Sequence, residues 1–196
     1  LVGSEMCIRD RIKVANTVKL KLLLSIIFVA ALLFEILHFL GSARVAPLYT
    51  IHTSIALPAN PPDSWNVLTD FAEYPNWNPY LTRVEGRFLV GEKVFFTLVD
   101  ENFADPLNLS ATLGEVSPNK RFFWTGRVGI QGLFDTKHVF ELVSSKEGTS
   151  VLHHYEEFRG LIPAILPDRE RRSANTRAAF ERMNHALYLQ LKDSDS

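Results

Sequence analysis

The hydrophobic pattern of the chain changes once, just after residue 40. Residues 22–40 read LLLSIIFVAALLFEILHFL, an apolar run with a single formally charged residue, Glu35. About 20 such residues cross a bilayer as an α-helix, and a helix buried in a soluble core normally keeps a polar stripe that is almost absent here. From Thr50 onward, short alternating segments are separated by turn residues, which is the pattern of a folded, β-rich domain.

The apolar run predicts one transmembrane helix, Leu22–Leu40, with a cytoplasmic N-terminus and the domain outside the cytoplasm. Positive charge favours the cytoplasmic side of a membrane, and it is concentrated before the run (Lys13, Lys19 and Lys21 before it, only Arg44 soon after). A cleaved signal peptide is the alternative, because small residues offer a cleavage site near Ala43, and it predicts a secreted domain. The run continues past Phe34 to Leu40, which favours the anchor.

The rest of the chain divides into a basic N-terminal segment (1–21), a linker (41–49), one folded domain (50–192) and a short tail (193–196). We set residues 1–11 aside, because LVGSEMCIRDR resembles a stray adapter-derived leader. This removes Cys7, so the remaining chain has no cysteine for a disulfide or a thiolate metal site. With a net charge of −1, the chain gives no electrostatic reason to expect nucleic acid as a partner.

Within the domain, the pattern predicts a strand (50–57), a helix (61–71), an irregular loop (75–80), six strands and a long C-terminal helix (168–192). The six strands are 81–90, 92–101, 107–116, 120–130, 135–144 and 149–160. Phe180, Met183, Leu187 and Leu191 form one stripe of the last helix. A run of antiparallel strands must have one face covered, and this helix is long enough to do so. We therefore expect an α+β fold, a curved sheet around a helix, with a pocket between them.

WNVLTDFAEYPNWNPYLTRVEG (65–86) resembles the opening of the START-like superfamily known as SRPBCC, or polyketide cyclase/dehydrase and lipid transport. Three later stretches agree in order: GLFDTKHVFEL (132–142), HYEEFRGLIP (154–163) and AAFERMNHAL (178–187). The resemblance implies the helix-grip fold, a seven-stranded antiparallel sheet around a long C-terminal helix. It also implies binding of hydrophobic small molecules, with a minority of members catalysing cyclisation or dehydration. It supplies no shared catalytic set.

The segment VLHHYEEFRG (151–160) places titratable groups on a face that should be buried. Leu152, His154, Glu156 and Phe158 share one face of the predicted strand. If the hairpin before it turns at Lys146, then Phe140 faces Leu152, His138 faces His154 and Thr136 faces Glu156. Buried histidine and glutamate side chains need partners, so they pair with each other, with water or with a ligand.

Three functions remain open. The first is a membrane-tethered module that binds a lipid or another apolar molecule, without a cofactor or metal. Its expected ligand-binding residues are Trp77, Trp124, His138, Phe140, Leu152, His154, Glu156, Phe158, Phe180 and Met183. The second is a cyclase or dehydratase in which His154 and Glu156 transfer protons; no catalytic residue is assigned. The third is a structural or partner-binding domain with a filled interior. The loop 98–107, which contains Phe103, is a candidate lid.

Overall fold

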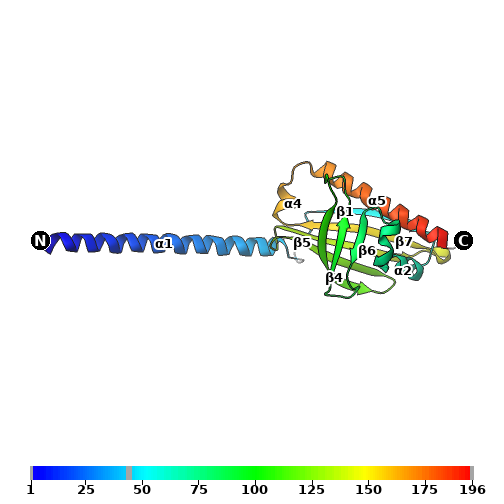
Figure 1. The fold of residues 1–196 in the computed structure, drawn as a ribbon, viewed down its shortest axis with the longest axis horizontal. Coiled ribbons are helices and arrows are strands. Elements are labelled where there is room, and N and C mark those ends of the chain that lie inside the picture. Colours follow the sequence, from blue (N-terminus) through cyan, green and yellow to red (C-terminus); the bar gives the residue numbers. More distant parts are fainter. Residues whose placement is uncertain (1, 43–45, 195–196) are drawn as a thin grey trace.

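The computed structural model describes residues 2–42 and 46–194, with side chains from residue 17 onward except at positions 147 and 194. Ala43 and Arg44, on which the cleavage site and the charge bias partly rest, lie outside the described residues. A rod-like helix, α1 (Val2–Leu40), projects from a β-rich domain (Figure 1). The segment Thr17–Leu40 is long and apolar enough to cross a membrane, a test that an N-terminal signal sequence also passes.

The domain is one antiparallel sheet of seven strands in the order β1-β7-β6-β5-β4-β3-β2. The strands are β1 (Tyr49–Leu57), β2 (Leu81–Glu85), β3 (Lys93–Leu98), β4 (Leu107–Ser117), β5 (Arg121–Val128), β6 (Phe134–Ser144) and β7 (Ser150–Arg159). The sheet is curved, and helix α5 (Arg169–Ser194) lies along its concave face (Figure 1). This is the helix-grip fold, as the sequence predicts.

The buried stripe of α5 is the one that its periodicity predicts. Phe180, Met183, Leu187 and Leu191 recur every three or four residues, so they lie on one side of the helix. All four are buried against the sheet. Because this helix has little other apolar surface, its packing on the sheet, more than helix propensity, stabilises it.

The hairpin between β6 and β7 has a different register from the one we expected. His138 pairs with Glu156 and Phe140 pairs with His154, a shift of two residues. The connection contains a 3-10 turn, η2 (Lys146–Gly148), and the Ser145 amide donates to the Thr149 carbonyl at 3.0 Å. The turn is therefore centred on residue 147 instead of Lys146. Because the shift is even, every side chain keeps its predicted face.

The region between β1 and β2 is more helical than predicted. Helix α2 (Pro61–Thr69) begins after Asn60, whose Oδ1 accepts a hydrogen bond from the Asp63 amide at 3.0 Å. It ends at Thr69 and is followed by a 3-10 turn, η1 (Phe71–Glu73), and by α3 (Tyr74–Trp77), where we expected an irregular loop. Pro75 is compatible with α3 because the first amides of a helix have no intrahelical acceptor.

Candidate functional site

A cavity of about 670 Å³ lies between the sheet and the first half of α5. It occupies the half of the sheet that contains Leu98, Val128 and Phe158. Its walls are mostly apolar, with a few polar groups among them. Four of these polar residues come from three separate segments of the chain: Asp100, then Thr136 and His138 together, and Glu156. An apolar hollow with a small number of converging polar groups is typical of a small-molecule site.

Aromatic side chains fill the other half of the interior. Phe122 stacks on Phe140 with ring centroids 4.8 Å apart, and Trp65 meets Phe122 edge-on at 5.6 Å. Phe71 and Phe88 also meet edge-on, at 5.4 Å. Such contacts add to the stabilisation that burial of the rings provides. This half is therefore solid core.

The boundary between the two halves follows the rows of paired residues that cross the sheet. One row contains Phe122, Phe140 and His154, and it belongs to the filled half. Four residues further along β5 and β6, beyond the row of Trp124, His138 and Glu156, the corresponding row reads Ala111, Gly126 and Thr136. Because these three side chains are small, no atoms fill the space above them, and the cavity begins there.

Two buried histidines lie at this boundary and form part of a hydrogen-bonded chain. The Nε2 atoms of His138 and His154 are 2.6 Å apart. Nδ1 of His154 lies 2.8 Å from Oδ1 of Asn184 on α5, and Nδ2 of Asn184 donates to Oγ1 of Thr53 at 2.9 Å. Thr53 donates its hydroxyl proton to the carbonyl oxygen of His154 at 3.1 Å. This series of hydrogen bonds thus links α5 to β1 and β7.

The series of hydrogen bonds determines which atom carries each proton. Because Thr53 gives its proton to a carbonyl, it can only accept from Asn184, and the Asn184 amide oxygen must then face His154. Nδ1 of His154 is therefore the protonated nitrogen, and its Nε2 accepts a proton from Nε2 of His138. This leaves Nδ1 of His138 as an acceptor.

Burial keeps both imidazoles neutral. Loss of solvation lowers the pKa of His138 well below its ordinary value, and proximity to His154 lowers it further. Burial also lowers the pKa of His154 to about 3, although the hydrogen bond to Asn184 opposes this shift. Neither side chain is charged near neutral pH.

Glu156 pairs with His138 across β6 and β7 and lines the cavity. Burial raises the pKa of its carboxyl group to about 7, Thr136 lowers it and the nearby carboxylate of Asp100 raises it. Tyr80 also lines the cavity, and burial beside these two carboxylates raises the pKa of its hydroxyl group. A proton donor that enters the cavity therefore meets several acceptors at this inner end.

The loop 98–107 is hydrogen-bonded to α5. Oδ2 of Asp100 accepts from the Thr176 hydroxyl at 2.7 Å, and Nδ2 of Asn102 donates to the Arg172 carbonyl at 2.9 Å. Phe103 lines the cavity and remains half exposed. The expected lid is thus a loop that closes part of the cavity and is anchored by polar contacts to the helix opposite.

Comparison with known proteins identifies the family. Residues 49–193 match the family model described as polyketide cyclase / dehydrase and lipid transport. The chain belongs to this family. No curated protein matches it.

The domain aligns with solved structures of the same fold over nearly the whole length of those structures. The Zhui aromatase/cyclase from Streptomyces sp. R1128 aligns with a TM-score of 0.60 at 13% identity, over 76% of this chain and 96% of the other. A norcoclaurine synthase from Thalictrum flavum aligns at 0.60 and 16%, over 78% and 99%. A START superfamily protein from Mycobacterium smegmatis aligns at 0.59 and 13%, over 74% and 97%. At such identities the likeness shows the fold alone.

In this SRPBCC domain, four of the ten expected ligand-binding residues line the cavity: Trp124, His138, Glu156 and Phe158. Five others lie in the filled core beside it: Phe140, Leu152, His154, Phe180 and Met183. Trp77 packs against Tyr74, with ring centroids 4.9 Å apart, outside the cavity wall. The structure thus brings four of the ten expected residues together in the cavity wall, five in the core behind it and one outside both.

Several residues of the cavity wall were not expected from the sequence. They include Tyr49, Tyr80, Asp100 and Arg172. Tyr80 and Asp100 lie at strand ends, where alternation no longer shows which way a side chain points. Arg172 lies on α5 among other arginines, a pattern that is typical of a solvent-exposed helix face. Only the contacts between distant segments reveal these four.

Proposed function

We propose that this protein is a membrane-tethered module that holds a hydrophobic small molecule or lipid in its cavity. The observation that supports it best is the cavity itself, an unfilled apolar space of about 670 Å³ inside an otherwise tightly packed domain. Natural interiors leave few voids larger than a water molecule. A space of this size falls in the range of small-molecule sites, roughly 300–1,000 Å³.

The polar inner end of the cavity suits a ligand with a hydroxyl group. Nδ1 of His138 and the carboxyl group of Glu156 lie on neighbouring strands and accept hydrogen bonds. A ligand carboxylate at this point would meet the negative charge of Asp100, and that of Glu156 once it is ionised. Like charges in a poorly solvated site repel each other strongly. We therefore propose a long apolar molecule that ends in a hydrogen-bond donor.

The tether rests on α1. The segment Thr17–Leu40 is exposed along almost its whole length and carries no polar face for packing on a soluble partner. Lys19 and Lys21 stand at its N-terminal end, which favours a cytoplasmic N-terminus and a domain on the other side. A membrane anchor keeps the cavity beside a supply of apolar molecules.

A cyclase or dehydratase is the second candidate. The pKa of about 7 for Glu156 favours it, since a group that titrates near the working pH transfers protons efficiently. His154 is less suited than we expected, because both of its ring nitrogens are engaged by Asn184 and His138. An enzyme in this family member would use Glu156 with His138, which reaches the cavity.

Native mass spectrometry of the full chain, released from detergent, tests whether the cavity is occupied. We expect a fraction of the protein to retain added mass that corresponds to one apolar molecule. Replacing Ala111 with Phe should reduce this fraction strongly, since the new ring would lie in the row of small residues where the cavity begins. Leu113→Phe, in the next row, is the matched control. Equal occupancy in both variants, or no added mass in the wild type, would argue against the proposed function.

Binding of a long-chain alcohol, compared with binding of the carboxylate of equal length, tests which polar group of a ligand the inner end of the cavity accepts. At pH 8, above the pKa of about 7, Glu156 is ionised, and we expect the alcohol to bind at least tenfold more tightly. The difference should shrink at pH 5.5, where Glu156 is protonated, and should be the same at both pH values in Glu156→Gln. Glu157→Gln is the control, because Glu157 pairs with Arg159 on the other face of β7. Equal affinity of the two probes at pH 8 would rule out this recognition, and conversion of either probe would favour the enzyme.

A further inference from the structure

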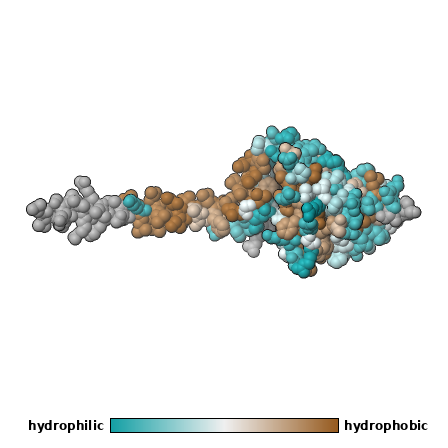
Figure 2. Space-filling view, viewed as in Figure 1, coloured by the Kyte–Doolittle hydropathy of each residue, from teal (hydrophilic) through white to brown (hydrophobic). Residues whose placement is uncertain are grey.

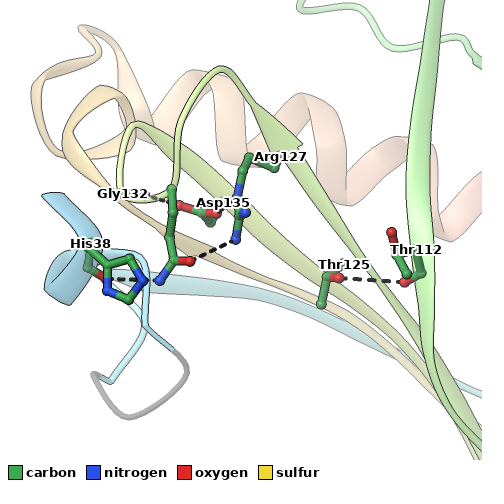
Figure 3. A network of polar contacts seen from close by, with 7 residues as sticks. His38, Thr112, Thr125, Arg127, Gly132 and Asp135 are labelled. Atoms are coloured by element: carbon green, nitrogen blue, oxygen red, sulfur yellow. Dashed lines mark hydrogen bonds and ion pairs between the residues drawn. The ribbon is translucent and has the colours of Figure 1, made fainter. Parts of the chain in front are cut away.

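The sheet divides between β4 and β5 on the side of the cavity. Pairing of the two strands begins at Ser117 and Arg121 and stops at Ala111 and Gly126, although both strands continue. Figure 3 shows them diverging beyond Thr112 and Thr125. Residues 108–110 and 126–129 border this division, and all of them line the cavity. We call the division the portal, since it connects the cavity to the surface.

The portal lies beside the last turn of α1. Nε2 of Gln131 donates to the His38 carbonyl at 2.9 Å, and Nη2 of Arg127 donates to Oε1 of Gln131 at 3.3 Å. Asp135 holds this arrangement, accepting from Nε of Arg127 at 2.6 Å and from the Gly132 amide at 2.5 Å (Figure 3). Arg127 therefore links the edge of the portal to the end of the helix.

No spacer separates the apolar helix from the portal. The apolar run continues to Leu40, yet the domain already contacts the backbone of Leu37 and His38. Three residues of α-helix span only about 4–5 Å. If α1 lies in a bilayer, this end of the domain must lie at the bilayer surface.

The same end of the domain exposes apolar side chains. Helix α4 (Leu161–Ile165) is fixed to the β5–β6 turn, because the amides of Leu161 and Ile162 donate to the carbonyls of Gly132 and Leu133 at 2.8 and 2.9 Å. Six residues around the turn, α4 and the neighbouring loop are between 41% and 69% exposed: Leu48, Phe103, Val128, Ile130, Leu161 and Ile165. We call these six the apolar rim. Figure 2 shows hydrophobic surface on the domain where α1 joins it.

We propose that the apolar rim inserts into the surface of a phospholipid bilayer, and that the portal passes the ligand directly between the membrane and the cavity. Single exposed apolar residues need no explanation, but a cluster around an opening marks an interaction surface. Its position at the end of an apolar helix identifies the partner as the bilayer. This inference rests on the proposed function, of which it specifies the route of ligand exchange.

Depth measurements on the full chain in phosphatidylcholine vesicles test the insertion of the rim. In a Cys7→Ser background, single cysteines replace Ile130, Ile165 or, as the control at the other end of the sheet, Val143, and each carries an environment-sensitive dye. Dyes at positions 130 and 165 should be quenched by spin-labelled lipids and protected from iodide, while the dye at 143 shows the reverse. Equal iodide access at all three positions would overturn the insertion of the rim, whatever the cavity binds.

Transfer kinetics test the portal. Ser110 is exposed beside the portal and Thr125 is exposed on β5 outside the cavity wall, so Ser110→Trp and Thr125→Trp form a matched pair. We expect Ser110→Trp to slow transfer of a fluorescent long-chain alcohol about tenfold in both directions, from vesicles to the protein and back, whereas weaker binding in the cavity would speed its return. Thr125→Trp should match the wild type. Normal affinity with equal transfer rates in both variants would overturn the portal alone. Absence of saturable binding in every form would overturn the proposed function, and the portal with it.

Discussion

Lowering the pH from 6.5 to 4.5 is expected to destabilise the folded chain through its two buried histidines. The unfolded chain binds protons on both imidazoles near pH 6.5, whereas burial holds the pKa of His154 at about 3 and that of His138 well below its ordinary value. Their contribution to stability is therefore complete above pH 6.5 and is lost as the pH falls. One pKa unit corresponds to about 1.4 kcal/mol, so His154 should cost roughly 2–3 kcal/mol over this interval, and His138 acts in the same direction.

Glu156 acts in the opposite direction over the same range. Its pKa is raised from 4.5 to about 7, so the folded state holds a proton that the unfolded state has released, and stability increases as the pH falls from 7 towards 4.5. The carboxyl group thus offsets about one of the two histidines. In the wild type, the free energy of unfolding should therefore depend on pH about as it would with a single buried imidazole.

Chemical denaturation at a series of pH values measures how the free energy of unfolding changes with pH. The double variant His138→Gln, His154→Asn cannot titrate at these positions, so its stability should fall less between pH 6.5 and 4.5, by more than the roughly 2–3 kcal/mol that His154 alone contributes. His185→Gln, which removes an exposed imidazole from α5, is the matched control. If the double variant and the wild type lose stability in parallel, the two histidines are not held neutral in the folded state.

The faces of the strands could be read from the sequence, but the rows across the sheet could not. Alternation in β7 correctly places Leu152, His154 and Phe158 inside. The partner of each residue depends on the length of a turn, and an error of two residues leaves alternation intact. In the expected register, His138 lies opposite His154 and both belong to the site. In the observed register, His138 lies opposite Glu156, and His154 lies opposite Phe140 in the filled core.

The cavity itself depends on that register. Ala111, Gly126 and Thr136 are unremarkable in the sequence, where each stands among larger residues of its own strand. Only the pairing of β4, β5 and β6 aligns them in one row and leaves space above it. A sequence can show that a sheet grips a helix; which part of the interior stays open follows from residues that meet only after folding.

The apolar helix was evident from its composition, and its attachment to the domain was not. We expected residues 41–49 to act as a linker, yet the domain contacts the helix before the apolar run has ended. The contact depends on Gly132, an ordinary turn residue in the sequence. Here φ is +84°, which favours glycine, and a Cβ would collide with the backbone of Leu37.

Replacing Gly132 with alanine is expected to separate the end of α1 from the β5–β6 turn. Gly148→Ala is the matched control: its φ of +77° imposes the same backbone strain, roughly 1–2 kcal/mol, but a Cβ there meets no atom within 4 Å. Both variants should lose similar domain stability if the clash at Gly132 is relieved by moving the helix. Distances between spin labels at Lys19→Cys and Val143→Cys, in a Cys7→Ser background, should broaden only in Gly132→Ala.

The same pair of variants connects the geometry to ligand exchange. In Gly132→Ala the cavity is intact, so affinity for a long-chain alcohol in detergent should be unchanged, while transfer from vesicles should slow because the portal is no longer held at the bilayer. Gly148→Ala should transfer at the wild-type rate. A narrow distance distribution in Gly132→Ala would mean that the turn, instead of the helix, yields to the new methyl group. The fixed orientation of the domain would then have to rest on the hydrogen bonds of Gln131 and Arg127, which do not require a glycine.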